Sequence, residues 1–301
     1  MKKDLVSMNQ LSGEDIQRIL DAASFMKQII LSGNKKAPHL QGKSIVTLFY
    51  ENSTRTRMSF ELASKYLGAA SANISASASS VAKGETLIDT GRTLDMMGTD
   101  IIIIRHPMSG AAALLAENVN ASVINAGDGM NEHPTQALLD IFSLREKKGS
   151  LEGLKVAIVG DIYHSRVARS NIIGMRKMGA RVVLAAPETL MPPRIEELGA
   201  EIAASADEAV SGADAVMGLR IQKERQQAGL LPSLREYFKY YGLDDRRIAL
   251  AKPDAVIMHP GPMNRGVEIS SSAADSPASI INEQVRSGVA VRMALLHILA
   301  H

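Results

Sequence analysis

One short segment has the residue types and the spacing to bind a phosphate or another anion: Ser-Thr-Arg-Thr-Arg at residues 53–57. It follows an apolar run at residues 43–50, whose β-branched and aromatic side chains predict a strand. A hydroxyl residue at its start can cap a helix, and the exposed N–H groups and macrodipole of a helix N-terminus favour an anion. Arg55 adds a planar fork of donors and Thr56 adds a hydroxyl. The segment is therefore predicted to be an anion site.

An Arg-x-Arg pair is also typical of a solvated helix surface. Glu51 and Glu61 are near enough in the sequence to form surface ion pairs with Arg55 and Arg57. Both interpretations, the anion site and the surface ion pairs, assume that a helix begins within this segment. Its apolar face is expected to begin at Met58, Phe60 and Leu62.

A further arginine ends a strongly apolar run. Residues 100–107 contain consecutive isoleucines followed by Arg105. An apolar run of this kind predicts a fully buried strand of a parallel sheet. Because α/β proteins build their sites at the carboxyl ends of such strands, Arg105 is predicted to be a site residue.

A histidine and a glutamine accompany the start of a later helix. Residues 122–125 predict a short strand, and a Gly-Asp-Gly turn follows. Pro134 suits the first position of a helix that continues to Lys148, so His133 and Gln136 are expected at or within its first turn, close together. A single histidine in this place is also typical of a cap or a surface residue.

Strands and helices alternate in the second half, which predicts a second parallel sheet. The expected strands are residues 155–160, 181–185, 215–219 and 255–258, with a helix at residues 164–178. A terminal helix is expected to start at Ser276-Pro277. Its apolar stripe is expected to be Ile280, Ile281, Val285, Val289, Met293 and Leu296.

Two arginines follow strands of this second half. Arg166 lies in a turn where a dinucleotide-binding fold has Gly-x-Gly-x-x-Gly, but only the first glycine, Gly160, is present, which disfavours a nucleotide-dependent oxidoreductase. Arg220 and Gln222 share one side if the chain is extended there, although a charged surface turn is the alternative. In the loop at residues 259–265, two prolines lack N–H groups and leave carbonyls free to accept.

Together these motifs resemble the carbamoyltransferase family. Residues 53–57 match the phosphate-binding signature of that family, and His-Pro-Thr-Gln at residues 133–136 matches it as well. Residues 80–87 resemble its flexible loop, whose lysine, here Lys83, reaches into the active site of the adjacent subunit; without the resemblance, this segment is typical of a solvated loop. The resemblance implies an α/β fold of two domains, each a parallel sheet flanked by helices, with the active site in the interdomain cleft.

The resemblance also implies a role for each matching residue. The expected catalytic residues are Arg55, Thr56, Lys83, Arg105 and His133, whereas Arg57 braces the segment. The residues expected to bind carbamoyl phosphate are Ser53, Thr54, Arg55, Thr56, Arg105, His133, Gln136, Gly261 and Pro262. Those expected to bind aspartate are Lys83, Arg166, Arg220 and Gln222. The loop serine that accompanies Lys83 is either Ser79 or Ser80.

The expected acceptor is aspartate. Residues 220–225 resemble the aspartate-binding loop and residues 259–262 resemble the loop of the aspartate branch, where the ornithine branch typically has a cysteine. Independently, two guanidiniums suit the two carboxylates of aspartate, whereas cationic ornithine would want an acidic pocket. The implied reaction converts carbamoyl phosphate and L-aspartate into N-carbamoyl-L-aspartate and phosphate, early in pyrimidine (UMP) biosynthesis. The alternatives are another amine such as ornithine, and a non-catalytic relative that binds anions.

The composition agrees with this assignment. A chain of 301 residues is long for one core and suits two domains, and Lys plus Arg at 34 against Asp plus Glu at 32 gives no basic field for nucleic acid or a membrane. The absence of cysteine excludes disulfides and thiolate metal sites and fits the cytoplasm. No apolar run approaches the roughly 20 residues that cross a bilayer. We expect no cofactor and no metal.

The expected carbamoyl-phosphate-binding domain is residues 1–134, with the terminal helix at residues 278–301 packed back on it. The expected aspartate-binding domain is residues 135–277. The family resemblance further implies a homotrimer with shared active sites. Association with regulatory chains or dihydroorotase stays open.

Overall fold

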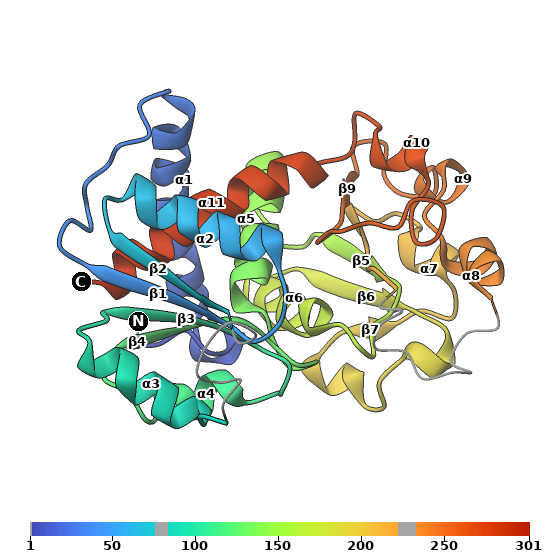
Figure 1. Cartoon of the computed structure of the whole chain (residues 1–301). Coiled ribbons are helices and arrows are strands. Elements are labelled where there is room, and N and C mark those ends of the chain that lie inside the picture. The colour runs from blue at the N-terminus through green and yellow to red at the C-terminus, as the bar shows by residue number, and fades with distance from the viewer. Residues whose placement is uncertain (1, 76–83, 222–232) are drawn as a thin grey trace. The chain divides into compact units, whose positions relative to one another are not determined.

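The computed structural model describes residues 2–75, 84–221 and 233–301, which form two compact units (Figure 1). Unit 1 comprises Met1–Leu139 and Arg286–His301, and unit 2 comprises Asp140–Val285. The chain passes from one unit to the other within two helices, α5 (Pro134–Lys148) and α11 (Ile281–Leu299). Among the described helices, none has the length and apolar character needed to cross a membrane.

Unit 1 contains a parallel sheet with the strand order β2-β1-β3-β4. The isoleucines of β3 are all buried, as expected for a strand covered on both faces. Helices α3 and α4 cover one face, and α2 lies on the other (Figure 1). The strands are β1 (Ser44–Phe49), β2 (Ala70–Ser75), β3 (Ile101–His106) and β4 (Ser122–Asp128). The helices are α1 (Gly13–Leu31), α2 (Thr54–Tyr66), α3 (Leu87–Met96) and α4 (Ala111–Ala116), with a 3₁₀ turn η1 (Met8–Gln10).

Unit 2 contains a second parallel sheet, with the strand order β7-β6-β5-β8-β9. Alternate residues of its central strands face a core of small aliphatic side chains shared with α7 and α10. The strands are β5 (Lys155–Val159), β6 (Arg181–Ala185), β7 (Glu201–Ile202), β8 (Ala215–Gly218) and β9 (Val256–Met258). The helices are α6 (Arg166–Lys177), α7 (Ala206–Val210), α8 (Leu234–Tyr241), α9 (Asp245–Ile248) and α10 (Ser271–Ala274), with 3₁₀ turns η4 (Glu188–Leu190) and η5 (Ile195–Leu198). The predicted α/β class with two parallel sheets is confirmed.

Several local predictions were wrong. The strand expected at residues 122–125 continues to Asp128, because the chain resumes pairing with β3 after a register shift. The helix expected from His164 begins at Arg166, and the terminal helix expected to start at Ser276-Pro277 begins at Ile281. Two side chains assigned to apolar helix faces, Met58 and Val285, are 52% and 57% exposed. An apolar side chain at helical spacing therefore did not by itself indicate burial at these positions.

Candidate active site

The predicted site residues of unit 1 follow neighbouring strands. The segment at residues 53–56 follows β1, Arg105 lies next to the last residue of β3, and His133 and Gln136 follow β4. Strands β1, β3 and β4 are adjacent in the sheet. Because the carboxyl ends of parallel strands share one edge, the sheet brings these side chains to the same edge of unit 1.

The anion segment forms the start of α2. Ser53 is the N-cap residue with extended backbone, but its hydroxyl makes no capping bond. Instead, Ser53 Oγ donates to Thr56 Oγ1 over 2.9 Å. Thr56 is buried, whereas Arg55 is exposed. The first turn of α2 thus presents its backbone N–H groups together with a hydroxyl pair and a guanidinium, which is a suitable set of donors for a phosphate.

Each of the two glutamates proposed as alternative partners for these arginines has at least one further partner in the structure. Glu61 pairs with Lys65 of the next helical turn at 2.7 Å, and this bond lowers the pKa of Glu61. The charge of Arg57 also contributes to the lowered pKa of Glu61. Glu51 pairs with Arg105 at 2.8 Å. The guanidinium of Arg57 lies 5.6 Å from the centre of the Phe49 ring, a cation–π contact that holds the segment against the end of β1.

Arg105 is held by groups on both sides of its strand. Its Nη2 donates to Glu51 Oε1 over 2.8 Å, and its Nη1 donates to the carbonyl oxygen of Ala126 over 3.3 Å. The side chain is only 12% exposed. The sequence interpretation missed Glu51 as a partner of Arg105, because the two residues are far apart in the chain and a glutamate after a strand is not distinctive.

His133 and Gln136 are buried at the start of α5. The carbonyl oxygen of His133 accepts the backbone N–H of Gln136 over 2.9 Å, which joins the two residues in the first helical turn as predicted. The His133 Nδ1 lies 3.4 Å from Thr135 Oγ1. Both side chains are therefore held on a rigid helix start.

The turn before His133 is organised by a buried carboxylate that the sequence interpretation did not single out, Asp128. Its Oδ1 accepts from Asn125 Nδ2 over 2.8 Å and from the Glu132 N–H over 3.1 Å. Its Oδ2 accepts the N–H of Gly110 over 2.7 Å. The available sequence signal was the Asp-Gly pair at Asp128 and Gly129, which indicates a turn but not its partners.

The predicted residues of unit 2 also follow neighbouring strands. Arg166 begins α6 after β5, Arg220 lies just after β8, and the loop with Gly261 and Pro262 follows β9. Strands β5, β8 and β9 are adjacent, so the two guanidiniums and the loop belong to the same edge of the unit 2 sheet. Arg166 is 5% exposed.

The turn after β5 does not have the form of a dinucleotide site. Gly160 has φ +140°, and a Cβ atom there would lie 2.8 Å from the carbonyl oxygen of Leu219, so close packing against the next strand requires this glycine. The second and third glycine positions of the dinucleotide motif are occupied by Ile162 and Ser165, both buried. These side chains fill the space that a pyrophosphate would need.

Asp161 holds the same turn from within. Its buried carboxylate lies 2.9 Å from His164 Nδ1 and also accepts the His164 N–H over 3.1 Å. Ser165 then caps α6 by accepting the Ala168 N–H over 3.1 Å. These contacts delay the helix start to Arg166 and place that arginine in its first turn.

Four predicted residues lie outside the part of the chain that the structure describes: Lys83, Gln222, and the alternatives Ser79 and Ser80. Among the described residues, no group of three or more His, Cys, Asp or Glu side chains is arranged to hold a metal ion.

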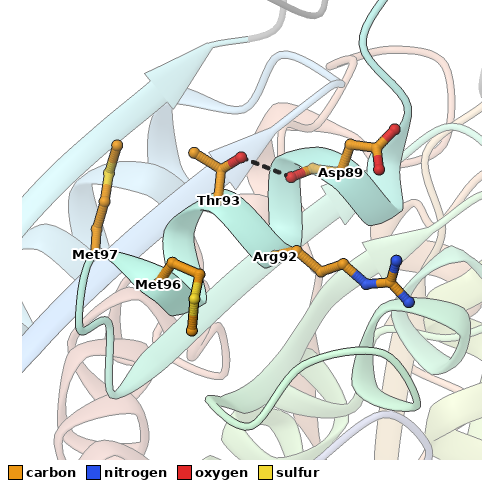
Figure 2. A pocket seen from close by; sticks show the side chains of 5 residues that line it. All are labelled: Asp89, Arg92, Thr93, Met96 and Met97. Atoms are coloured by element: carbon orange, nitrogen blue, oxygen red, sulfur yellow. Dashed lines mark hydrogen bonds between the residues drawn. The ribbon is translucent and has the colours of Figure 1, made fainter.

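A surface pocket lies on α3 (Figure 2). It is lined by Asp89, Arg92, Thr93, Met96 and Met97. Thr93 Oγ1 donates to the Asp89 carbonyl oxygen over 2.8 Å, and Met96 and Met97 are 82% and 74% exposed. None of the predicted site residues lines this pocket, so it is not the candidate active site.

Comparisons with known proteins cover almost the whole chain. Residues 3–146 match the model of the aspartate/ornithine carbamoyltransferase carbamoyl-P binding domain, and residues 152–299 match the model of the Asp/Orn binding domain. An aspartate carbamoyltransferase catalytic subunit from Acetivibrio thermocellus is 70% identical over 297 residues, covering 99% of this chain and 95% of that protein.

Solved structures of both kinds of transferase are similar. The aspartate transcarbamoylase of Trypanosoma cruzi, in complex with carbamoyl aspartate and phosphate, has a TM-score of 0.89 and 34% identity, covering 98% of this chain and 94% of that one. The ornithine carbamoyltransferase of Pyrococcus furiosus has a TM-score of 0.88 and 32% identity, covering 97% and 95%. The fold alone therefore does not distinguish the two acceptors.

Proposed function

Since the chain belongs to the aspartate/ornithine carbamoyltransferase family, we propose that it transfers the carbamoyl group of carbamoyl phosphate to L-aspartate, giving N-carbamoyl-L-aspartate and phosphate. This reaction is an early step of pyrimidine biosynthesis. The observation that chiefly supports aspartate is the pair of arginines, Arg166 and Arg220, that follow adjacent strands of unit 2.

The charge of these arginines selects the acceptor. Two planar guanidiniums are suitable bidentate partners for the two carboxylates of aspartate. Ornithine carries a cationic side chain, which such a pair would repel. The 70% identical relative from A. thermocellus, named as an aspartate carbamoyltransferase, supports the same choice. Gln222 is proposed as a third aspartate ligand.

The reaction needs no protein nucleophile. The neutral α-amine of aspartate attacks the carbonyl carbon of carbamoyl phosphate, a tetrahedral oxyanion forms, and phosphate leaves. The backbone at residues 53–56 and the Arg55 guanidinium hold the phosphate, because they combine helix N-terminal N–H groups with a positive charge. Thr56, Arg105 and His133 donate to the carbamoyl oxygen as its charge builds.

Orientation of the carbamoyl group also contributes to the rate of the reaction. The side chain of Gln136 and the carbonyl oxygens of Gly261 and Pro262 accept from the carbamoyl NH₂. Lys83 from a neighbouring subunit contacts both substrates. We assign no general base, because the departing phosphate can itself accept the proton.

Assembly is part of the proposal. A homotrimer with shared sites is required if Lys83 acts in the neighbouring subunit. Met96 and Met97, at the end of α3, are adjacent in the sequence and are 82% and 74% exposed, which is consistent with an association surface there. Residues 1–134 with 278–301 would bind carbamoyl phosphate, and residues 135–277 would bind aspartate.

Steady-state assays with carbamoyl phosphate and either amino acid test the substrate assignment. Aspartate should support turnover, and ornithine should not. Turnover with ornithine alone would show that the acceptor is wrong, and no turnover with either would favour a non-catalytic relative that binds anions. Tight binding of NAD, measured by calorimetry, would instead support the alternative of a nucleotide-dependent oxidoreductase.

A further inference from the structure

The loop that follows β9 is held by three buried side chains, and we propose that Gln284, His259 and Glu268 are positioning residues that fix the carbonyl oxygens of Gly261 and Pro262 toward the carbamoyl NH₂. This inference rests on the function proposed above. We assign to these residues the preference of the site for an NH₂ group over a methyl group on the carbonyl carbon of the acyl phosphate.

Gln284 connects the start of the loop to a buried carboxylate. Its Nε2 donates to Asp140 Oδ1 over 2.7 Å, and its Oε1 accepts the His259 N–H over 3.0 Å. Asp140 is 0% exposed and Gln284 is 3% exposed. Because an ionised carboxylate can only accept, the amide of Gln284 has one orientation here, with its oxygen toward the loop. Helix α11 thereby holds the first N–H of the loop.

His259 holds the next N–H with its own ring. Its Nδ1 accepts the Gly261 N–H over 2.9 Å. A ring nitrogen that accepts cannot carry a proton, so His259 is the neutral tautomer with its proton on Nε2. This Nε2 is buried and lies 3.4 Å from Glu268 Oε1. The carboxylate of Glu268 therefore faces the protonated side of the ring and favours this tautomer.

Glu268 also holds the far end of the loop. Its Oε1 accepts the backbone N–H of Asn264, and its Oε2 lies 3.4 Å from Asn264 Nδ2. Glu268 is 1% exposed. A carboxylate is seldom buried unless hydrogen bonds compensate its lost hydration, so these contacts are its substitute for water. The loop is thus fixed at both ends by side chains from outside it.

These bonds determine which groups the loop can offer. Pro260 and Pro262 have no N–H, and the N–H groups of His259, Gly261 and Asn264 are bound by side chains. The loop therefore presents mainly carbonyl oxygens. Such a surface accepts the two hydrogens of an NH₂ group, whereas a methyl group of the same size would leave it unsatisfied.

Acetyl phosphate tests the inference, because it differs from carbamoyl phosphate by a methyl in place of the NH₂. Gln284→Met keeps the length of the side chain and removes both hydrogen bonds. It should lower kcat/KM for carbamoyl phosphate by about 10- to 100-fold. The inhibition constant of acetyl phosphate, measured as a competitor of carbamoyl phosphate, should change little. Glu268→Met should have the same effect as Gln284→Met. Glu268→Gln, which retains an oxygen that can accept the Asn264 N–H, should lower kcat/KM for carbamoyl phosphate less.

Asn171→Leu is the matched control. Asn171 Nδ2 donates to Asp140 Oδ2 over 2.8 Å, so this variant removes a bond to the same buried carboxylate without reaching the loop. Asn171→Leu should lower thermal stability as Gln284→Met does. However, kcat/KM for carbamoyl phosphate, relative to the inhibition constant of acetyl phosphate, should stay as in the wild type. The inference is wrong if Gln284→Met and Glu268→Met impair the use of carbamoyl phosphate and the binding of acetyl phosphate by the same factor. It is also wrong if they leave both unchanged. A wild-type protein without carbamoyl transfer would instead refute the proposed function.

Discussion

At the scale of single residues, carboxylates hold the candidate site residues or the turns that precede them. Glu51 holds Arg105, Asp128 holds the turn before His133, and Asp161 holds the turn before Arg166. A donor that is already oriented needs no reorganisation when negative charge develops, which is the main advantage of a folded site over water. The arginines and the histidine that we propose to bind the substrates were singled out in the sequence through their motifs. Their carboxylate supports could not, because an Asp or Glu in a short loop has the same appearance whether it is solvated or buried.

Arg105→Ala is the most direct test at this scale. Loss of one donor to a developing oxyanion should lower kcat by about 10²- to 10³-fold. The free energy of unfolding should fall by about 1 to 3 kcal/mol, because the Arg105 side chain is only 12% exposed and its removal leaves Glu51 without this ion-pair partner. Steady-state kinetics with aspartate and thermal unfolding measure the two effects. Arg57→Ala, which removes the contact with Phe49, serves as the control and should keep far more of the rate. A near-normal kcat for Arg105→Ala would contradict its role.

At the scale of elements, predictions from the pattern of residues succeeded for strands and failed at boundaries. The consecutive isoleucines of β3 and the alternating strands of unit 2 were correctly placed. The end of β4 was missed because Ala126, Gly127 and Asp128 are poor strand formers. The register of β4 against β3 shifts at Ala126 and Gly127, and pairing resumes between Asp128 and His106. The start of α6 was missed because Asp161 captures His164, a contact of one side chain with another that periodicity cannot reveal.

A histidine near the end of α11, His297, should make the free energy of unfolding depend on pH. The ring of His297 lies 5.3 Å from that of His39 and 5.1 Å from that of His301, measured between ring centres. Its burial, followed by the neighbouring His301 and His39, lowers the pKa of His297 below its usual value. Above about pH 6.5 the ring is neutral in both the folded and the unfolded chain. As the pH falls below that value, the unfolded chain gains a proton that the folded chain resists, so the free energy of unfolding should decrease.

His297→Leu removes this titration and also the buried Nδ1, which has no hydrogen-bond partner among the described residues. Its free energy of unfolding should therefore fall less steeply than that of the wild type between pH 7 and pH 5, as measured by urea unfolding at each pH. His39→Gln, which removes one of the neighbouring rings, should reduce the slope by a smaller amount. Equal slopes for the wild type and His297→Leu would exclude His297 as the cause.

At the scale of the whole molecule, the proposed trimer would take one of the predicted site residues, Lys83, from a different subunit from the others. Arg55 would bind carbamoyl phosphate in its own chain, and Lys83 would act in the neighbouring one. Chains with Arg55→Ala and chains with Lys83→Ala should each be nearly inactive alone. In a ring of three chains mixed at random in equal amounts, about one quarter of the sites receive an intact Arg55 and an intact neighbouring Lys83, so activity should return to about that fraction of the wild type. Dissociating and reassociating the mixed chains, with each variant treated alone as the control, measures this recovery. No recovery in particles shown by their mass to be mixed trimers would mean that each chain completes its own site.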